Sequence, residues 1–504
     1  MIRTILPPIL SCLLLLGGSL VAPADELPNI ILLMGDDHGW DETGYNGHPH
    51  LATPVLDEMA AKGLRLDRFY SAHPSCSPTR GSVLTGRHPN RYGTFTPGHS
   101  IRPEEISVAA ILKAKGYLCG HFGKWHLGPV KKSSPTNPGN MGFDEWLSHD
   151  NFFELNPILS RNGADPQMIP GESSEIIVHA ATRFISKAKR KGKPFFIVLW
   201  YGSPHEPYSG LEDDLALYDH IPARYNDQSF RLTSNETGRP TTRPLGDILQ
   251  ERYAEITAMD RSIGTLRDFL ARKNERENTL LWYCGDNGTP GDGIVTSPFR
   301  GQKGQVYDGG IRVPGVIEWP KRINAQIISQ VNSVTSDILP TLCEITGSEL
   351  PTIPLDGISL AGLFDDSLKQ RPTPIFFWQF NTGADTQRTP WINHELQIGT
   401  TPLVKMMGDI YTRNFRNSKH PDIVESDFTG ARVMLIENYK LVITGQSPKE
   451  KLQLFKMPDD LAEKHNIAAQ HPDVVSSMRK QLHRWQSSVL KSLTGADYEQ
   501  HIQP

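Results

Sequence analysis

The apolar residues of this chain gather in short runs that alternate with helical patterns. The clearest runs cover residues 30–34, 117–122, 195–200 and 280–284. Each has the length of a β-strand, and each follows or precedes a segment with helical spacing. This alternation predicts an α/β fold, with a large central and mostly parallel sheet flanked by helices.

Two segments carry apolar residues at the spacing of one helical face. Between residues 175 and 189, the apolar side chains are Ile177, Ala180, Ala181, Phe184, Ile185 and Ala188. A similar stripe runs from residue 248 to 270. Because positions three and four apart share one side of a helix, both segments are predicted to be amphipathic helices.

The pattern of apolar and polar residues changes after about residue 370. Short apolar runs at residues 375–380 and 440–443 are followed by a polar helical tail. We therefore predict a main domain over residues 25–370. A smaller C-terminal α+β domain, residues 371–504, is predicted to contain an antiparallel sheet.

The N-terminus has the pattern of a secretory signal peptide. Arg3 precedes an apolar stretch at residues 9–20, and Ala22-Pro23-Ala24 fits a cleavage site. An uncleaved anchor is the alternative, but the stretch is short for a membrane span of ~20 residues. We predict that residues 1–24 are removed, that the mature protein is periplasmic or secreted, and that it keeps no stable membrane span.

Composition and charge narrow the possible partners. The chain has 504 residues, 38% of them hydrophobic, which is enough for a large core. Removal of residues 1–24, whose one charged residue is Arg3, changes the formal net charge from -4 to about -5. The negative net charge of the protein does not attract nucleic acid or another polyanion, so an anionic substrate would need a local basic site. The cysteines left after cleavage are too few for disulfide bonds to be the main stabilisation of an exported protein of this size: Cys76, Cys119, Cys284 and Cys343.

Two pairs of metal-binding residue types follow predicted strands. Asp36-Asp37 come after residues 30–34, and Asp286-Asn287 come after residues 280–284. Ligands of open α/β sheets gather beyond the C-terminal ends of the strands, so the two pairs could meet there. Together they offer only oxygen ligands and three negative charges, which suits Ca²⁺ or Mg²⁺ better than Zn²⁺. Solvated turns are the alternative, which the matching positions disfavour.

The segment Cys76-Ser77-Pro78-Thr79-Arg80 is the most informative in the chain. Ser77 could cap a short helix, Pro78 suits its first position, and Gly86 could end it. Cys76 would then lie at a helix N-terminus, where unpaired N–H groups favour an anion. A buried cysteine beside an ordinary turn is the alternative.

In order along residues 28–320, the chain resembles the type I sulfatases, which are formylglycine-dependent members of the alkaline-phosphatase-like superfamily. The shared segments are residues 29–34 with Asp36-Asp37, Thr53-Pro54, residues 76–80 with 84–87, residues 123–128, Asp286-Asn287-Gly288 and residues 309–314. Weaker similarities follow at residues 438–441 and 454–455. Thr79 departs from the family pattern, where Ser is commoner. The resemblance implies that residues 25–370 form a catalytic sulfatase domain.

The resemblance also implies roles for individual residues. A formylglycine-generating maturation enzyme would oxidise Cys76 to an aldehyde, whose hydrate would attack sulfur. One Ca²⁺ would be held by Asp36, Asp37, Asp286, Asn287 and the modified residue at 76. Arg80 would hold the hydrate, Lys124 and His126 would bind and orient it, and His126 would later remove its proton. Lys303 with His205 would grip the sulfate and protonate the leaving alcohol. Lys124, His205 and Lys303 would thus bind substrate.

The chemistry of a sulfate ester agrees with these assignments. Its nonbridging oxygens are negative and its leaving oxygen gains charge, so the site needs positive groups and a proton donor. The candidates lie in segments marked by Gly or Pro: Arg80, Lys124, His126, His205 and Lys303.

Two other functions remain open from the sequence. A phosphodiesterase or phosphonate monoester hydrolase could share the scaffold, although a two-metal phosphatase needs further Asp/His clusters that are not evident. A non-catalytic glycan-binding relative would keep the fold, although every expected position is filled. The polar loops at residues 129–170 and 379–428 favour sugar recognition, and we expect a sulfated polysaccharide or glycosaminoglycan as substrate.

Overall fold

We describe the protein from a computed structural model that covers residues 26–234, 239–382, 388–403, 412–445 and 449–498. The predicted signal peptide, residues 1–24, lies outside these described residues. Among the helices within these ranges, none is long and apolar enough to cross a lipid bilayer.

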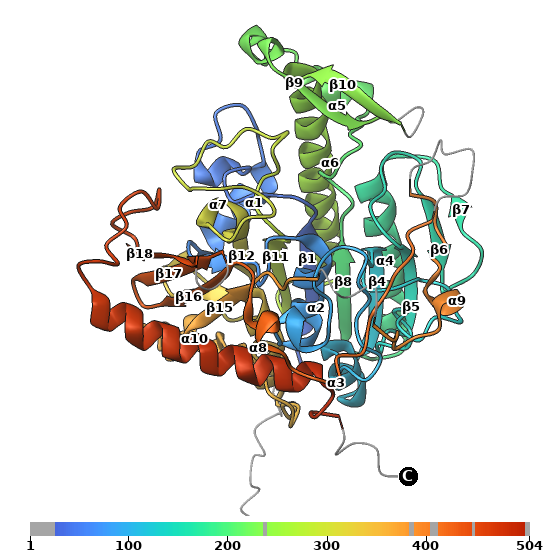
Figure 1. Ribbon diagram of the computed structural model, residues 1–504. Coiled ribbons are helices and arrows are strands. Elements are labelled where there is room, and N and C mark those ends of the chain that lie inside the picture. The colour runs from blue at the N-terminus through green and yellow to red at the C-terminus, as the bar shows by residue number, and fades with distance from the viewer. Residues whose placement is uncertain (1–25, 235–238, 383–387, 404–411, 446–448, 499–504) are drawn as a thin grey trace, which may run out of the picture.

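A ten-stranded sheet forms the centre of the protein, in the order β13-β2-β12-β11-β1-β8-β4-β5-β6-β7 (Figure 1). Its middle strands run parallel to one another: β11 (Thr279–Gly285), β1 (Asn29–Gly35), β8 (Phe195–Trp200), β4 (Leu118–Lys124) and β5 (Glu145–His149). Both edges include antiparallel pairs, formed by β2 (Leu64–Leu66), β12 (Gly315–Glu318), β6 (Ile158–Arg161) and β7 (Gln167–Met168), while β13 (Ile327–Ser329) lies parallel to β2. The predicted α/β class with a mostly parallel sheet is confirmed.

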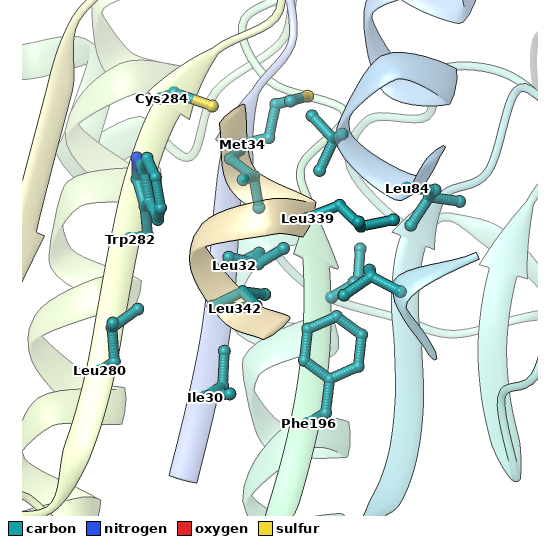
Figure 2. Packing of buried hydrophobic residues seen from close by; sticks show 14 of the residues in the cluster. Ile30, Leu32, Met34, Leu84, Phe196, Leu280, Trp282, Cys284, Leu339 and Leu342 are labelled. Carbon is teal, nitrogen blue, oxygen red and sulfur yellow. The ribbon is translucent and has the colours of Figure 1, made fainter. Parts of the chain in front are cut away.

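The middle strands are apolar throughout because helices cover both faces of the sheet. All seven residues of β1 are buried. Ile30, Leu32 and Met34 pack on one face with α2 (Cys76–Thr85), α3 (Val108–Ala114) and α8 (Ile338–Thr346). Figure 2 shows Leu339 and Leu342 of α8 against this face. Side chains alternate along a strand, so Ile31 and Leu33 pack on the other face.

The opposite face is covered by the two predicted amphipathic helices and by α1 (Pro54–Lys62). These helices are α4 (Ser173–Arg190) and α6 (Leu245–Arg272), and each includes the predicted segment with a few residues more at both ends. Their apolar stripes supply the buried residues that the spacing indicated, including Phe184 and Ile263.

The C-terminal part forms a four-stranded antiparallel sheet with a long helix, as predicted. The strands are β15 (Ile375–Trp378), β16 (Arg432–Ile436), β17 (Tyr439–Thr444) and β18 (Lys451–Lys456). One face packs against α10 (Pro472–Leu493) and the other against residues of the main domain such as Tyr70 and Ile311. The boundary at residue 370 stays a prediction.

Short elements complete the described chain. They are β3 (Phe69–Tyr70), α5 (Glu212–Ala216), β9 (Ser229–Thr233), β10 (Pro240–Pro244), α7 (Asp308–Ile311), β14 (Ser333–Val334) and α9 (His394–Gln397), together with single turns of 3-10 helix.

The start of α2 differs from the predicted one. The helix begins at Cys76 with Ser75 as the N-cap residue, so Ser77 lies inside the first turn. Pro78 is tolerated there because the first four N–H groups of a helix have no partner within the helix. Gly86 ends α2 with φ 68° and donates its N–H to the Ser82 carbonyl, as the sequence indicated.

Candidate active site

The ends of β1 and β11 bring the two acidic pairs together. The strands are in register with Gly35 opposite Gly285, so Asp36-Asp37 and Asp286-Asn287 leave the sheet side by side. The Asp37 N–H donates to Asp286 Oδ1 at 2.9 Å, and Asn287 Nδ2 donates to Asp37 Oδ1 at 3.0 Å. All four side chains are buried.

Asp37 has a left-handed backbone with φ 60°, which is rare for a residue other than glycine. Its carbonyl accepts from Arg252 Nη2 at 2.7 Å, and Arg252 is itself paired with Glu42. These buried contacts hold a conformation that costs about 1–3 kcal/mol and aim the carboxylate toward Cys76.

Cys76 lies directly against this acidic group. Its Sγ is 3.7 Å from Asp37 Oδ1, and its side chain is almost completely buried. Burial raises the pKa of the thiol well above its usual range, so an unmodified Cys76 would be a poor nucleophile.

Arg80 lies one helical turn beyond Cys76 and is fully buried. Its Nη2 donates to Asp286 Oδ2 at 2.7 Å and is 3.4 Å from Asp36 Oδ1. The guanidinium also lies 5.1 Å from the centre of the Trp200 ring. Arg80 therefore ties α2 to the acidic strand ends.

Two lysines approach the aspartates from other parts of the chain. Lys124, the last residue of β4, pairs with Asp36 Oδ2, and Lys303 pairs with Asp37 Oδ2 at 2.5 Å. His205 Nε2 lies 3.4 Å from Lys303 Nζ and 3.6 Å from Asp37 Oδ2. Its ring stacks on Phe152 with centroids 4.5 Å apart.

Charges within the site separate the pKa values of the three carboxyls. Burial raises the pKa of Asp36, but Lys124, His205 and Arg80 outweigh burial and hold it well below its usual range. Burial also raises the pKa of Asp37, but the charge of Lys303 acts against burial, and the pKa falls to about 2. Burial and the neighbouring Asp36 raise the pKa of Asp286 to about 7.

Both histidines of the site are neutral near pH 7. Burial lowers the pKa of His205 to about 4. Burial, together with Lys124 and Arg413, lowers the pKa of His126 well below its usual value. His126 has φ 57°, and both of its ring nitrogens are buried without a hydrogen-bond partner among the described residues. A neutral imidazole in this position can accept a proton.

The acidic group fits a hard cation. Asp36 Oδ1 and Asn287 Oδ1 are buried and accept no hydrogen bond from the described residues, so both can act as ligands. One ligand atom from each of Asp36, Asp37, Cys76 and His205 also lies within 4.8 Å of the others. Carboxylate and amide oxygens are the ligands that Ca²⁺ and Mg²⁺ prefer.

Comparison with known proteins identifies the family. A model of the family "Sulfatase" matches residues 28–348. The chain belongs to the sulfatase family. This sulfatase is 32% identical to Arylsulfatase A of Homo sapiens over 389 residues, which are 70% of each protein. It is 30% identical to N-acetylgalactosamine-6-sulfatase of Homo sapiens over 405 residues, 71% of this chain and 70% of that protein.

A solved structure supports the fold of this sulfatase. The crystal structure of Ps i-CgsB superimposes with a TM-score of 0.73 at 21% identity, over 95% of this chain and 98% of that chain. The sequence resemblance and the alkaline-phosphatase-like architecture are thus confirmed, and the chain is an enzyme, a sulfatase.

The structure brings the ten sequence-predicted site residues to one edge of the sheet, whereas their roles stay predictions. Three neighbours were not found from the sequence. Trp200 lies under Arg80, Phe152 stacks on His205, and Arg413 interacts electrostatically with His126. The one available signal was that Phe152 and Arg413 fall in the polar loops at residues 129–170 and 379–428.

Proposed function

We propose that this sulfatase is exported and removes sulfate from a sugar ester, through a formylglycine made from Cys76 and with one bound Ca²⁺. The observation that carries the proposal is the surroundings of Cys76. A buried side chain at a helix start faces three carboxylates that are held by Arg80, Lys124 and Lys303. Such an arrangement serves an anionic ester better than a neutral one.

The metal would be held by Asp36, Asp37, Asp286, Asn287 and the modified residue 76. Ca²⁺ in this place would supply positive charge beside the nucleophile and the sulfate oxygens. The formylglycine hydrate would supply a nucleophilic oxygen and a second hydroxyl, neither of which a thiol offers.

The remaining roles belong to this chain's own side chains. Arg80, which is part of α2, holds the residue at position 76 in place, and Lys124, at the end of β4, binds the hydrate formed there. Burial lowers the pKa of Lys303, but Asp37 outweighs burial and raises it, so Lys303 stays protonated. Lys303 therefore binds sulfate oxygens and carries a proton for the leaving alcohol through His205, which lies 3.4 Å away. Neutral His126 removes a proton at position 76.

A sugar is the proposed alcohol part of the substrate. One relative is named for sulfate on N-acetylgalactosamine. Beside His205, aromatic and apolar residues that include His149, Phe152, Pro207 and Leu403 line a small hollow. Aromatic and polar side chains together suit a sugar ring, so we propose a sulfated polysaccharide or glycosaminoglycan fragment.

Export and maturation complete the proposal. The predicted signal peptide would direct the chain to the periplasm or the medium, and a formylglycine-generating enzyme would modify Cys76. Thr79 keeps the hydroxyl of the commoner Ser and donates it to the His73 carbonyl at 2.8 Å.

Two measurements test this function. The mass of the peptide containing position 76 should show an aldehyde or its hydrate in place of the thiol. Cys76→Ala should lower sulfate release by about 10⁴-fold, because the nucleophile is lost. Cys343→Ala is the matched control, since Cys343 is equally buried but lies in α8. An unmodified thiol in fully active enzyme would refute the mechanism, and a preference for aryl phosphate diesters over aryl sulfates would favour the phosphoesterase alternative.

A further inference from the structure

Arg413 is a cation at the active site that the mechanism above does not use. It follows Thr412, which forms an antiparallel bridge with Pro402. Two residues further on, Phe415 donates its N–H to the Gln397 carbonyl at 2.8 Å, and its ring lies 6.5 Å from that of His126. The segment thus packs against the loop that carries His126.

The backbone around Arg413 is anchored to the main sheet. Asp150, which directly follows β5, accepts the N–H groups of Thr400 and Thr401. Asp150 also accepts from the Val130 N–H at 2.7 Å. Because β5 is the parallel neighbour of β4, this clamp sets Arg413 relative to Lys124 and His126.

The guanidinium has no partner of its own within the described residues. Its Nε is buried and donates to no acceptor there, and no carboxylate of those residues lies within ion-pair distance. Gly98 lies beside it, at a distance where a Cβ would be in ordinary van der Waals contact with Arg413 Nη2, 3.5 Å away. A half-buried cation without a counterion is costly unless a ligand supplies the anion.

Arg413 interacts electrostatically with Cys76 and with His126. Burial lowers the pKa of Arg413, and the nearby Cys76 opposes that shift. Arg413 in turn contributes to the low pKa of His126. The carboxylates at the strand ends are already matched by Arg80, Lys124 and Lys303. Arg413 is therefore available to the substrate.

We propose that Arg413 is a specificity residue that binds a second anionic group of the substrate, a carboxylate or a further sulfate next to the scissile ester. This inference rests on the proposed function and narrows it to sugars with at least two negative groups. The planar guanidinium can bind two oxygens of either anion at once, which an ammonium group cannot do.

Binding is measured by calorimetry on Cys76→Ala protein, so that turnover plays no part. The probes are a neutral hexose with one sulfate ester, the same hexose with two sulfates, and a uronic acid with one sulfate. With Arg413→Gln, the Kd of at least one doubly charged sugar should rise about 10- to 100-fold. The Kd of the monosulfated hexose should change less than about twofold. The probe that loses affinity identifies the second anion.

Controls make the result specific to Arg413. Arg413→Lys keeps the charge but cannot make the bidentate contact, so its loss of affinity should be intermediate. Arg183→Gln removes an equal charge from the exposed face of α4 and should leave every Kd unchanged. Equal losses for mono- and doubly charged sugars would mean that Arg413 binds the scissile sulfate, and unchanged affinity for all three would also overturn the proposal.

Sulfate release by the protein with Cys76 and Arg413 intact is a separate readout. If none of the sugars and no aryl sulfate is hydrolysed, the proposed function fails, while the binding comparison still decides the role of Arg413.

Discussion

Replacement of Lys440 by Met should test how the C-terminal sheet supports the active site. Lys440 lies on β17 and its side chain is fully buried. Its Nζ donates to Asp308 Oδ1 at 2.7 Å and is 2.9 Å from Glu463 Oε1. Asp308 begins α7, and the Gly310 carbonyl of α7 accepts the Gly288 N–H at 3.0 Å, next to Asn287.

The expected loss follows from the two carboxylates that would remain. At an effective dielectric constant of about 20, each contact of this length is worth roughly 6 kcal/mol, most of it offset by desolvation of the three groups. Removal of one partner from such a buried group typically costs about 3–5 kcal/mol. We expect Lys440→Met to lower the free energy of unfolding by about 3–5 kcal/mol near pH 8.

The loss should shrink in acid. Burial already raises the pKa of Glu463 to about 6, and without Lys440 it should rise further. An acid whose pKa is raised in the folded state binds more protons there than in the unfolded chain, so stability falls as the pH rises above about 4.3. Between pH 8 and pH 5 the variant should therefore recover up to about 1.4 kcal/mol for each unit by which its pKa has risen.

Urea unfolding of both proteins at pH 5 and pH 8 measures these differences. Adding Glu463→Gln to the variant should recover part of the loss at pH 8. Lys456→Met is the matched control, because Lys456 on β18 is exposed and its ion pair with Asp459 is exposed too, so the free energy of unfolding should stay close to that of the unchanged protein at both pH values. A loss that is equal at both pH values, or unaffected by Glu463→Gln, would refute the reasoning.

Two further predictions concern the metal and the acid limit of stability. Calcium at about 100 times its Kd should stabilise the protein against thermal unfolding by ~2.7 kcal/mol, and Asn287→Leu should abolish that gain. A melting temperature that does not change with calcium in either protein would contradict the metal site. Burial raises the pKa of Asp356, but Arg91 outweighs burial and lowers it through contacts of 2.7 and 2.8 Å. Because the folded-state pKa is lower than the unfolded one, this pair stabilises the protein above about pH 3.9, and the stabilisation is lost as the pH falls. Asp356→Asn should cost about 3 kcal/mol at pH 7 and flatten the acid part of the stability profile, and an unchanged profile would argue against the pairing.

Most of the fold could be predicted because its signals are local. Residues 30–34 and 280–284 are apolar at every position, as parallel strands covered on both faces must be. The polar pairs that follow them lie at equivalent points of neighbouring strands, so register alone brings Asp37 and Asp286 together.

The parts that escaped prediction depend on contacts between distant segments. Lys440 and Asp308 are 132 residues apart, and nothing in either segment marks the other as its partner. Arg413 lies in a loop whose path is set by Asp150, which follows β5. At the start of α2, Pro78 indicated a helix beginning two residues later than Cys76, because proline is acceptable at several positions of a first turn.

The burial of α2 limits when the proposed modification of Cys76 could take place. All ten residues of this helix are inaccessible in the folded protein, held between the sheet and α8. An enzyme that made the proposed formylglycine could not reach the thiol once the chain has folded, so it would have to act while residues 76–80 are still extended. Protein that folds with its sulfur in place would remain inactive until it is unfolded again.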